Sequence, residues 1–370
     1  MDDRVHQHAS LLIDWSARID AGDNVVINVA EGAHDLAVAV ADVLGERGAN
    51  LVTTYNSAEI SRAYSRAHDT DFESAPAHEH ALYDNADSVL ILAGDRNTTA
   101  TADVSGETKQ AAAQANAQVR EARMSTDWVS TVHPTRALAQ QAGMAYEQYQ
   151  NFVYDAILRD WETLADEMDR LKQYLDAGSE LRIVSDDSNT DITMSIENRT
   201  AVNSAASVAY DSHNLPSGEV FTAPVETAVS GTVQFDVPMT IQDTRIRDAV
   251  LTFEDGTVID YDATAGVDTL GNILNTDPGA RRLGEVGIGM NRGIDQITNK
   301  ILFDEKMGDT VHLAVGRAYD ACLPADESGN DSAVHVDLIA DIGSGAQLEI
   351  DDEIIQRNGQ FRWESGFEYA

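Results

Sequence analysis

A strand–helix–strand pattern near the N-terminus is the feature that most constrains the fold. Residues 24–29 are a run of β-branched and apolar residues, which predicts a buried strand. Residues 35–47 carry apolar side chains at largely helical spacing, and Gly48 ends the predicted helix. Residues 50–55 and 88–92 predict two further strands. Because short connections join these elements into a βαβ unit, the sheet is expected to be largely parallel.

Helices dominate the sequence that follows. The pattern predicts one helix over 107–123, a second that begins near Pro134 with proline in its first turn, and a third, long helix over 148–175. We therefore interpret residues 1–177 as an N-terminal α/β domain with a doubly wound parallel sheet.

The second half of the chain has the character of an antiparallel protein. Predicted strands lie at 180–185, 191–197 and within 227–242. The dipeptides Asp255-Gly256 and Asn358-Gly359 stand between apolar runs, and both are strong signals for a β-hairpin. Residues 178–370 are accordingly expected to form an α+β domain.

The charge of the chain excludes whole classes of partner. The 63 acidic and 25 basic residues give a formal net charge of −38, so nucleic acids and anionic membranes are not expected to bind. The excess is spread along the chain, and a dispersed acidic surface repels itself unless salt screens it. We interpret the protein as halophilic, with an ordinary acidic mesophilic protein as the alternative. The polar N-terminus has no apolar targeting region, which predicts a cytoplasmic protein.

Several common kinds of site are absent from the sequence. Gly94-Asp95 follows a predicted strand but lacks the glycine-rich pattern of nucleotide sites, and no Gly-x-Ser-x-Gly motif occurs. The single cysteine, Cys322, excludes a disulfide framework and a thiolate-rich zinc site, and we expect it to be buried and inert.

The candidate chemistry lies in the second half of the chain. His335 and Asp337 stand two residues apart in a strand-like run, so their side chains are expected on the same face as two ligands for one cation. Glu219 is predicted at the start of a strand, and small neighbours surround Glu285. Each residue also has an ordinary interpretation: His312 as a hydrogen-bonded core histidine, for example, or Glu285 as the partner of a nearby arginine. Residue types alone indicate a two-domain α/β protein with a possible metal site.

Several ordered motifs together resemble the thermophilic-type metalloprotease family of aminopeptidases, which use two metal ions. The resemblance runs over almost the whole chain. It is carried by residues 216–224, 282–285, 302–305, 312–319, 335–337 and 357–359, with a looser match over 133–144. Between Glu305 and His312 the sequence departs from the more uniform family pattern, which leaves the substrate preference open.

The resemblance implies a site and an activity. The implied ligands are Glu219, Glu285, His312, Tyr319, His335 and Asp337. These oxygen and nitrogen donors suit two divalent ions, Zn²⁺, Co²⁺ or Mn²⁺, bridged by Glu219 or Glu285. Tyr319 is expected to ligate a metal or to donate a hydrogen bond to the developing oxyanion, and Glu285 to take part in catalysis. The resemblance also implies a homodimer that releases N-terminal amino acids from peptide substrates. A non-catalytic metal- or peptide-binding protein and another two-metal hydrolase remain as alternatives.

Overall fold

The computed structural model describes residues 2–68, 72, 76–241 and 244–368. The chain forms two compact units. Unit 1 comprises the described residues up to Arg159 together with Ala206–Pro216, and unit 2 comprises Asp160–Ala205 and the described residues from Ser217 onward. This division differs from the expected boundary between residues 177 and 178. The residues of α9 (Trp161–Ala177) belong to unit 2, and a later segment returns to unit 1.

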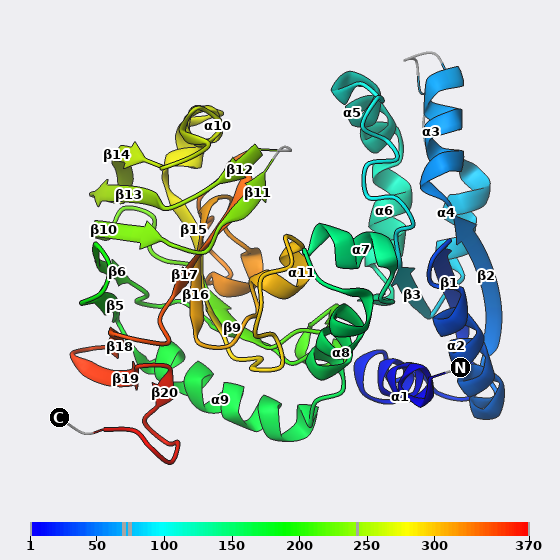
Figure 1. The fold of residues 1–370 in the computed structure, drawn as a ribbon, viewed down its shortest axis with the longest axis horizontal. Coiled ribbons are helices and arrows are strands. Elements are labelled where there is room, and N and C mark those ends of the chain that lie inside the picture. The colour runs from blue at the N-terminus through cyan, green and yellow to red at the C-terminus, as the bar shows by residue number, and fades with distance from the viewer. Residues whose placement is uncertain (1, 69–71, 73–75, 242–243, 369–370) are drawn as a thin grey trace. The chain divides into compact units, whose positions relative to one another are not determined.

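Unit 1 is built on a parallel five-stranded sheet in the order β2-β1-β3-β4-β8, as the βαβ pattern predicts (Figure 1). Its strands are β1 (Asn24–Ala30), β2 (Asn50–Asn56), β3 (Ser88–Ala93), β4 (Asp127–Val132) and β8 (Asn214–Leu215). Its helices are α1 (Asp3–Leu11), α2 (His34–Arg47), α3 (Ala58–Ala67), α4 (Ala77–Asp84), α5 (Gly106–Ala115), α6 (Ala117–Met124), α7 (Arg136–Gln141) and α8 (Tyr146–Ile157), with the short helices η1 (Leu12–Ser16) and η2 (Val208–Tyr210).

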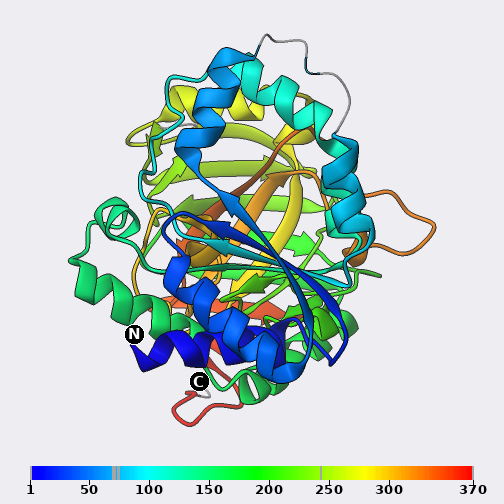
Figure 2. The same ribbon diagram turned by 90° about the vertical axis from the view of Figure 1, so that its right-hand side faces the viewer.

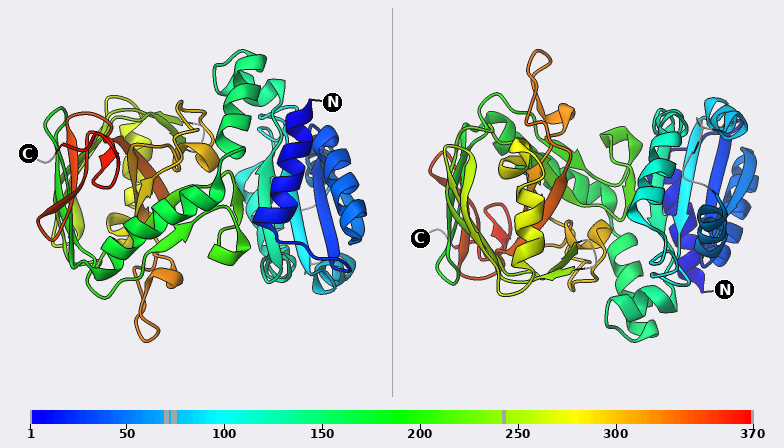
Figure 3. Two further views of the ribbon diagram at one scale, coloured as in Figure 1. Left: turned by 90° about the horizontal axis from the view of Figure 1, so that it is seen from below. Right: turned by 90° about the horizontal axis from the view of Figure 1, so that it is seen from above.

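Helices cover both faces of this sheet (Figure 3). On one face, Tyr83 of α4 and Val119 of α6 pack against Val26 and Val89 of the central strands. On the other face, His8 of α1 is fully buried with its Nε2 2.7 Å from the hydroxyl of Thr131 on β4. Apolar side chains on both faces explain why β1 and β3 are continuous hydrophobic runs, as in other sheets covered on two sides.

Two predicted helices are each broken in the structure. The helix expected over 107–123 is α5 and α6, separated at Asn116, whose side-chain amide donates to the carbonyl of Ala112 at 3.0 Å. The helix expected over 148–175 is α8 and α9, and α9 (Trp161–Ala177) has its own N-cap, Asp160, which accepts from the Thr163 amide at 3.1 Å. Both prediction errors have the same cause. A short polar side chain ends or caps a helix by bonding the backbone, without the glycine or proline that marks a break in the sequence.

Unit 2 contains two antiparallel sheets and a two-stranded ribbon. The eight-stranded sheet consists, in order, of β14 (Thr257–Asp262), β13 (Ala249–Glu254), β10 (Val229–Phe235), β6 (Thr190–Ser195), β5 (Glu180–Ser185), β18 (Ala346–Ile350), β19 (Glu353–Arg357) and β20 (Gln360–Phe361). The five-stranded sheet consists of β17 (His335–Asp341), β16 (Thr310–Gly316), β15 (Leu283–Gly289), β9 (Glu219–Thr222) and β7 (Val202–Ser204). The ribbon pairs β11 (Met239–Ile241) with β12 (Thr244–Ile246). The helices are α9, α10 (Val267–Leu274), α11 (Ile301–Asp304), η3 (Pro278–Arg281) and η4 (Asp320–Cys322).

The five-stranded sheet forms the interior of unit 2. Figure 2 shows its yellow and orange strands crossing the green strands of the eight-stranded sheet. Every residue of β15 and β16 is buried, so side chains of both faces are removed from water. Both predicted hairpins are confirmed, at Asp255-Gly256 between β13 and β14 and at Asn358-Gly359 between β19 and β20. Among the residues that the structure describes, no helix is long and apolar enough to cross a membrane.

Candidate metal centre

Four neighbouring strands present the candidate ligands on one face of the five-stranded sheet. In the strand pairing, Glu285 and Asp337 both stand opposite Ala314, and His312 stands opposite Gly287. Side chains alternate along a strand, and directly paired residues share a face. Glu285, His312, His335 and Asp337 therefore project together, although they come from three strands.

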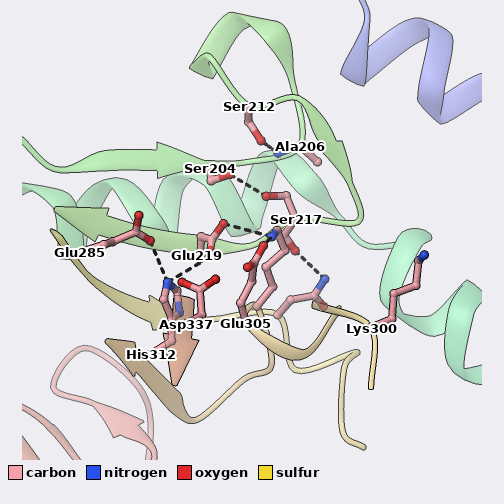
Figure 4. Close-up of polar contacts among 12 residues, drawn as sticks. Ser204, Ala206, Ser212, Ser217, Glu219, Glu285, Lys300, Glu305, His312 and Asp337 are labelled. Atoms are coloured by element: carbon pink, nitrogen blue, oxygen red, sulfur yellow. Dashed lines mark hydrogen bonds and ion pairs between the residues drawn. The ribbon is translucent and has the colours of Figure 1, made fainter. Parts of the chain in front are cut away.

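Glu219 joins the same face from the fourth strand. It is the first residue of β9, the position that the sequence predicted, and it pairs with Gly289 of β15. Gly289 lies four residues after Glu285, so the two carboxylates extend from the same side of the sheet. Figure 4 shows Glu219, Glu285, His312 and Asp337 gathered at one place.

Glycine at position 287 makes room for the imidazole. A Cβ atom built there would overlap Cε1 and Nε2 of His312. Because the ring lies directly over the backbone of β15, only a residue without a side chain fits beneath it.

His312 lies between the two glutamates. Its Nε2 is 2.9 Å from Oε1 of Glu285 and 3.7 Å from Oε2 of Glu219. All three side chains are almost fully buried. The second oxygen of Glu285, Oε2, is 3.7 Å from Nε2 of His335, which in turn is 3.5 Å from Oδ1 of Asp337. The two oxygens of Glu285 thus face two different groups of donors.

The geometry and the donor chemistry fit bound cations. One ligand atom from each of Glu285, His335 and Asp337 lies within 4.8 Å of the others. Oε2 of Glu285 is buried and has no hydrogen-bond partner among the described residues, an arrangement that is costly unless a cation is present. The other nitrogen of His335, Nδ1, donates to the carbonyl of Arg317 at 2.8 Å, which turns the lone pair of Nε2 toward the carboxylates.

Tyr319 lies at the exposed side of this cluster. It follows β16, and its ring centroid is 4.9 Å from that of His335 and 5.9 Å from that of Phe221. About half of the residue is exposed (48%). Burial of its hydroxyl and the nearby charges of Glu285 and Asp337 raise the pKa of Tyr319 above its usual value. The structure therefore brings Tyr319 beside the other predicted residues, but less deeply buried than they are.

A buried lysine is the site feature that the sequence reasoning missed. Lys306 has no exposed surface, its Nζ lies 3.2 Å from Oε1 of Glu219, and it forms a second ion pair with the partly exposed Glu305. Figure 4 shows Glu305 beside Glu219. The available signal was compositional: Lys306 is one of only four lysines in a chain with 25 basic residues.

The charges in the cluster depend strongly on one another. Burial by itself would lower the pKa of His312 and His335, but the hydrogen bonds and charges of the surrounding carboxylates raise these values to about 10 and about 9. Burial also raises the pKa of Glu219 and Glu285, with Lys306 and His312 acting in the opposite direction. Such a concentration of buried ionisable groups is typical of a functional site.

The ordinary interpretation of Glu285 as the partner of a nearby arginine is not supported. Arg281 donates to the Val258 carbonyl and to Asn275, and Arg282 donates to the Glu226 carbonyl, so neither arginine is recorded as a partner of Glu285. Cys322 is free, and it is buried as expected; burial raises the pKa of its thiol to about 12, which disfavours the reactive thiolate.

A parallel α/β unit and an antiparallel unit with a buried centre of carboxylates and imidazoles define a class: a two-unit protein equipped to bind divalent cations. The sequence profile described as thermophilic metalloprotease (M29) matches residues 1–361. The chain belongs to this metalloprotease family.

Individual relatives agree with this assignment. Aminopeptidase 2 of Geobacillus stearothermophilus is 29% identical, over 97% of each chain. Aminopeptidase T of Thermus thermophilus is 26% identical, over 93% of each chain. The solved structure of wild-type AmpT from Thermus thermophilus has a TM-score of 0.85 at 24% identity and covers 97% of this chain and 99% of its own, which shows a shared fold. The 2,5-dihydroxypyridine dioxygenase of Pseudomonas putida KT2440 shares the fold more distantly, with a TM-score of 0.60 at 14% identity over 98% of each chain.

Proposed function

We propose that the protein is a metal-dependent aminopeptidase that releases N-terminal amino acids from peptides at a centre with two divalent ions. The observation that carries the proposal is the position of Glu285 between two groups of donors. Its Oε1 faces His312, with Glu219 beyond, and its Oε2 faces His335 and Asp337. This arrangement favours Glu285, rather than Glu219, as the bridging carboxylate.

The chemistry of such a centre suits peptide hydrolysis. Divalent ions held there would lower the pKa of a bound water to near neutrality and polarise the scissile carbonyl. The residues of the chain have separate tasks. Lys306 holds one oxygen of Glu219 and leaves the other facing His312.

Tyr319 is assigned as a hydrogen-bond donor to the oxygen on which negative charge develops. It packs on the ring of His335, and about half of the residue is exposed, so a bound peptide can reach it.

The alternatives have less support. A phosphoesterase commonly uses free arginine or lysine side chains to bind the phosphate. Lys306, the cation that contacts Glu219, is already paired with two carboxylates, and the bonds recorded for Arg281 and Arg282 are to other groups. A purely binding protein predicts uptake of metal without turnover. We also propose a homodimer, from the family resemblance, and, separately, a cytoplasmic location.

The test is the substitution Glu219→Gln, measured with aminoacyl p-nitroanilides in KCl. Loss of one ligand charge is expected to reduce kcat by more than about 100-fold and to lower the amount of bound metal. Substituting a residue that only hydrogen-bonds to a metal ligand already costs about 10–100-fold in activity or metal affinity, and a ligand itself should matter more. Glu254→Gln on β13 is the matched control, since Glu254 is exposed, and it should leave both quantities unchanged.

Metal removal and a blocked substrate complete the test. A chelator should abolish turnover, and Zn²⁺, Co²⁺ or Mn²⁺ should restore it. N-acetylation of the substrate should abolish cleavage by an aminopeptidase. If the Glu219→Gln variant retains near-normal turnover with full metal content, the assigned site is wrong.

A further inference from the structure

A cavity in unit 2 begins at the candidate metal ligands. Its volume is about 320 Å³, and its lining includes His335 and Asp337 of β17. This places it at the small end of the range for ligand pockets, about 300–1,000 Å³. Any group bound in the cavity therefore lies directly beside the proposed reaction centre.

Three segments form the walls. Along β17 the cavity extends to Ile339, whose side chain lies on the same sheet face as Asp337, two residues earlier. Met239 and Ile241 of β11 form a second wall. Ile301, the first residue of α11, contributes the third. The wall of β11 is held against β17 through Val237, two residues before the strand, whose amide donates to the Ile339 carbonyl at 3.3 Å.

The charged groups of the lining are already engaged. His335 and Asp337 belong to the metal cluster. Oδ1 of Asp304 accepts from both the amide and the hydroxyl of Thr298, at 2.8 and 2.7 Å, and so holds the loop before α11. The remaining polar side chains in the described lining, Thr240 and Asn299, are uncharged. A lysine, arginine or glutamate side chain would therefore lose part of its hydration against these aliphatic walls.

We propose that this cavity receives the side chain of the substrate's N-terminal residue and selects aliphatic side chains of the size of leucine or methionine over charged ones. The inference rests on the proposed aminopeptidase function and adds its substrate class. Aliphatic walls favour such side chains by removing apolar surface from water. Met239 is flexible and polarisable and adapts its shape to the bound group.

The first measurement is kcat/KM for leucyl, methionyl, alanyl, lysyl and glutamyl p-nitroanilides, with metal and KCl held constant. The kcat/KM values of leucyl and methionyl substrates are expected to exceed those of lysyl and glutamyl substrates by at least about tenfold. A single methylene group in an apolar pocket already changes kcat/KM by about this factor. If none of the five is cleaved, the proposed function fails. If the charged substrates are cleaved as well as the leucyl one, the function stands and the pocket assignment is wrong.

The second measurement uses charge substitutions at Ile301, which is 50% exposed and therefore tolerant of change. Ile301→Asp should raise the lysyl-to-leucyl ratio of kcat/KM by at least about tenfold, and Ile301→Lys should raise the glutamyl-to-leucyl ratio instead. Ile259→Asp is the matched control, because Ile259 is 56% exposed on β14 and lies outside the cavity lining. Unchanged ratios in both Ile301 variants, with normal metal content, would overturn the proposal.

Discussion

Lys306 is a buried charge whose position makes sense only beside the metal centre. Burial alone would lower its pKa, but Glu219 and Glu305 raise it, so the side chain remains an ammonium. A buried ion pair is a weak source of stability by itself, because desolvation offsets the attraction. The ion pair instead orients Glu219: the ammonium holds one carboxylate oxygen, and the other oxygen faces His312.

The substitution Lys306→Met tests this role. Removing the ammonium leaves the buried carboxylate of Glu219 beside the partly exposed carboxylate of Glu305 without a cation, a change that costs about 3–5 kcal/mol of unfolding free energy. We expect that loss in the presence of a chelator and a smaller loss with saturating Zn²⁺, because the cation then offsets the charge of Glu219. Urea unfolding at constant KCl measures both. Lys109→Met, at an exposed position of α5, is the control. Equal losses with and without metal would contradict the coupling.

At the scale of elements, β15 determines how closely the ligands approach. Glu285, Gly287 and Gly289 share one face of this strand, so a ligand is followed by two positions without side chains. His312 from β16 lies over the first of these glycines, and Glu219 of β9 pairs with the second. The alternation of ligand and glycine is what allows donors from adjacent strands to converge.

Gly287→Ala is the corresponding prediction. The added methyl group overlaps the His312 ring, so the imidazole must move away from Glu285. We expect at least about a tenfold loss of metal affinity, the lower end of the effect of disturbing a ligand's surroundings. Isothermal titration with Zn²⁺ measures it.

The control for that substitution is Gly45→Ala in α2, where a Cβ meets nothing within 4 Å. Alanine stabilises a helix interior by roughly 0.5–1 kcal/mol relative to glycine. The Gly45→Ala variant should therefore bind Zn²⁺ normally and unfold at slightly higher urea. Normal Zn²⁺ affinity in the Gly287→Ala variant would show that the histidine has more freedom than the structure indicates.

At the scale of the whole molecule, the net charge of −38 governs the conditions in which the chain folds. The recorded ion pairs, such as Arg182 with Asp191 and Arg292 with Asp309, offset only a part of the 63 acidic residues. The remaining repulsion acts over about 10 Å at 0.1 M salt and over about 3 Å at 1 M.

We therefore expect Tm to rise steeply as KCl increases from about 0.1 M to molar concentrations, because screening removes repulsion that destabilises the compact state. Differential scanning calorimetry across a KCl series measures this, with sucrose at matched water activity as the non-ionic control. A Tm that is indifferent to KCl would refute the halophilic interpretation and leave an ordinary acidic protein.

The sequence by itself determined which segments form helices and strands, and which side chains share one face of a strand. The parallel sheet of unit 1 follows from continuous apolar runs joined by short connections, and the placement of His335 and Asp337 on one face follows from the two-residue repeat of a strand. Hairpins follow from Asp-Gly and Asn-Gly, whose backbones accept left-handed turns. These are local properties, set by residues within a few positions of one another.

Only the tertiary structure decided which strands lie side by side. The pairing of β9, β15, β16 and β17 brings residues as distant in sequence as Glu219 and His335 onto one sheet face, and no local preference specifies it. The same limit applies to Lys306, whose partner Glu219 is distant in sequence, and to residues 206–216, which return to unit 1 as part of its sheet. Contacts of this kind depend on how whole faces pack together, and that packing is a property of the folded chain rather than of any segment.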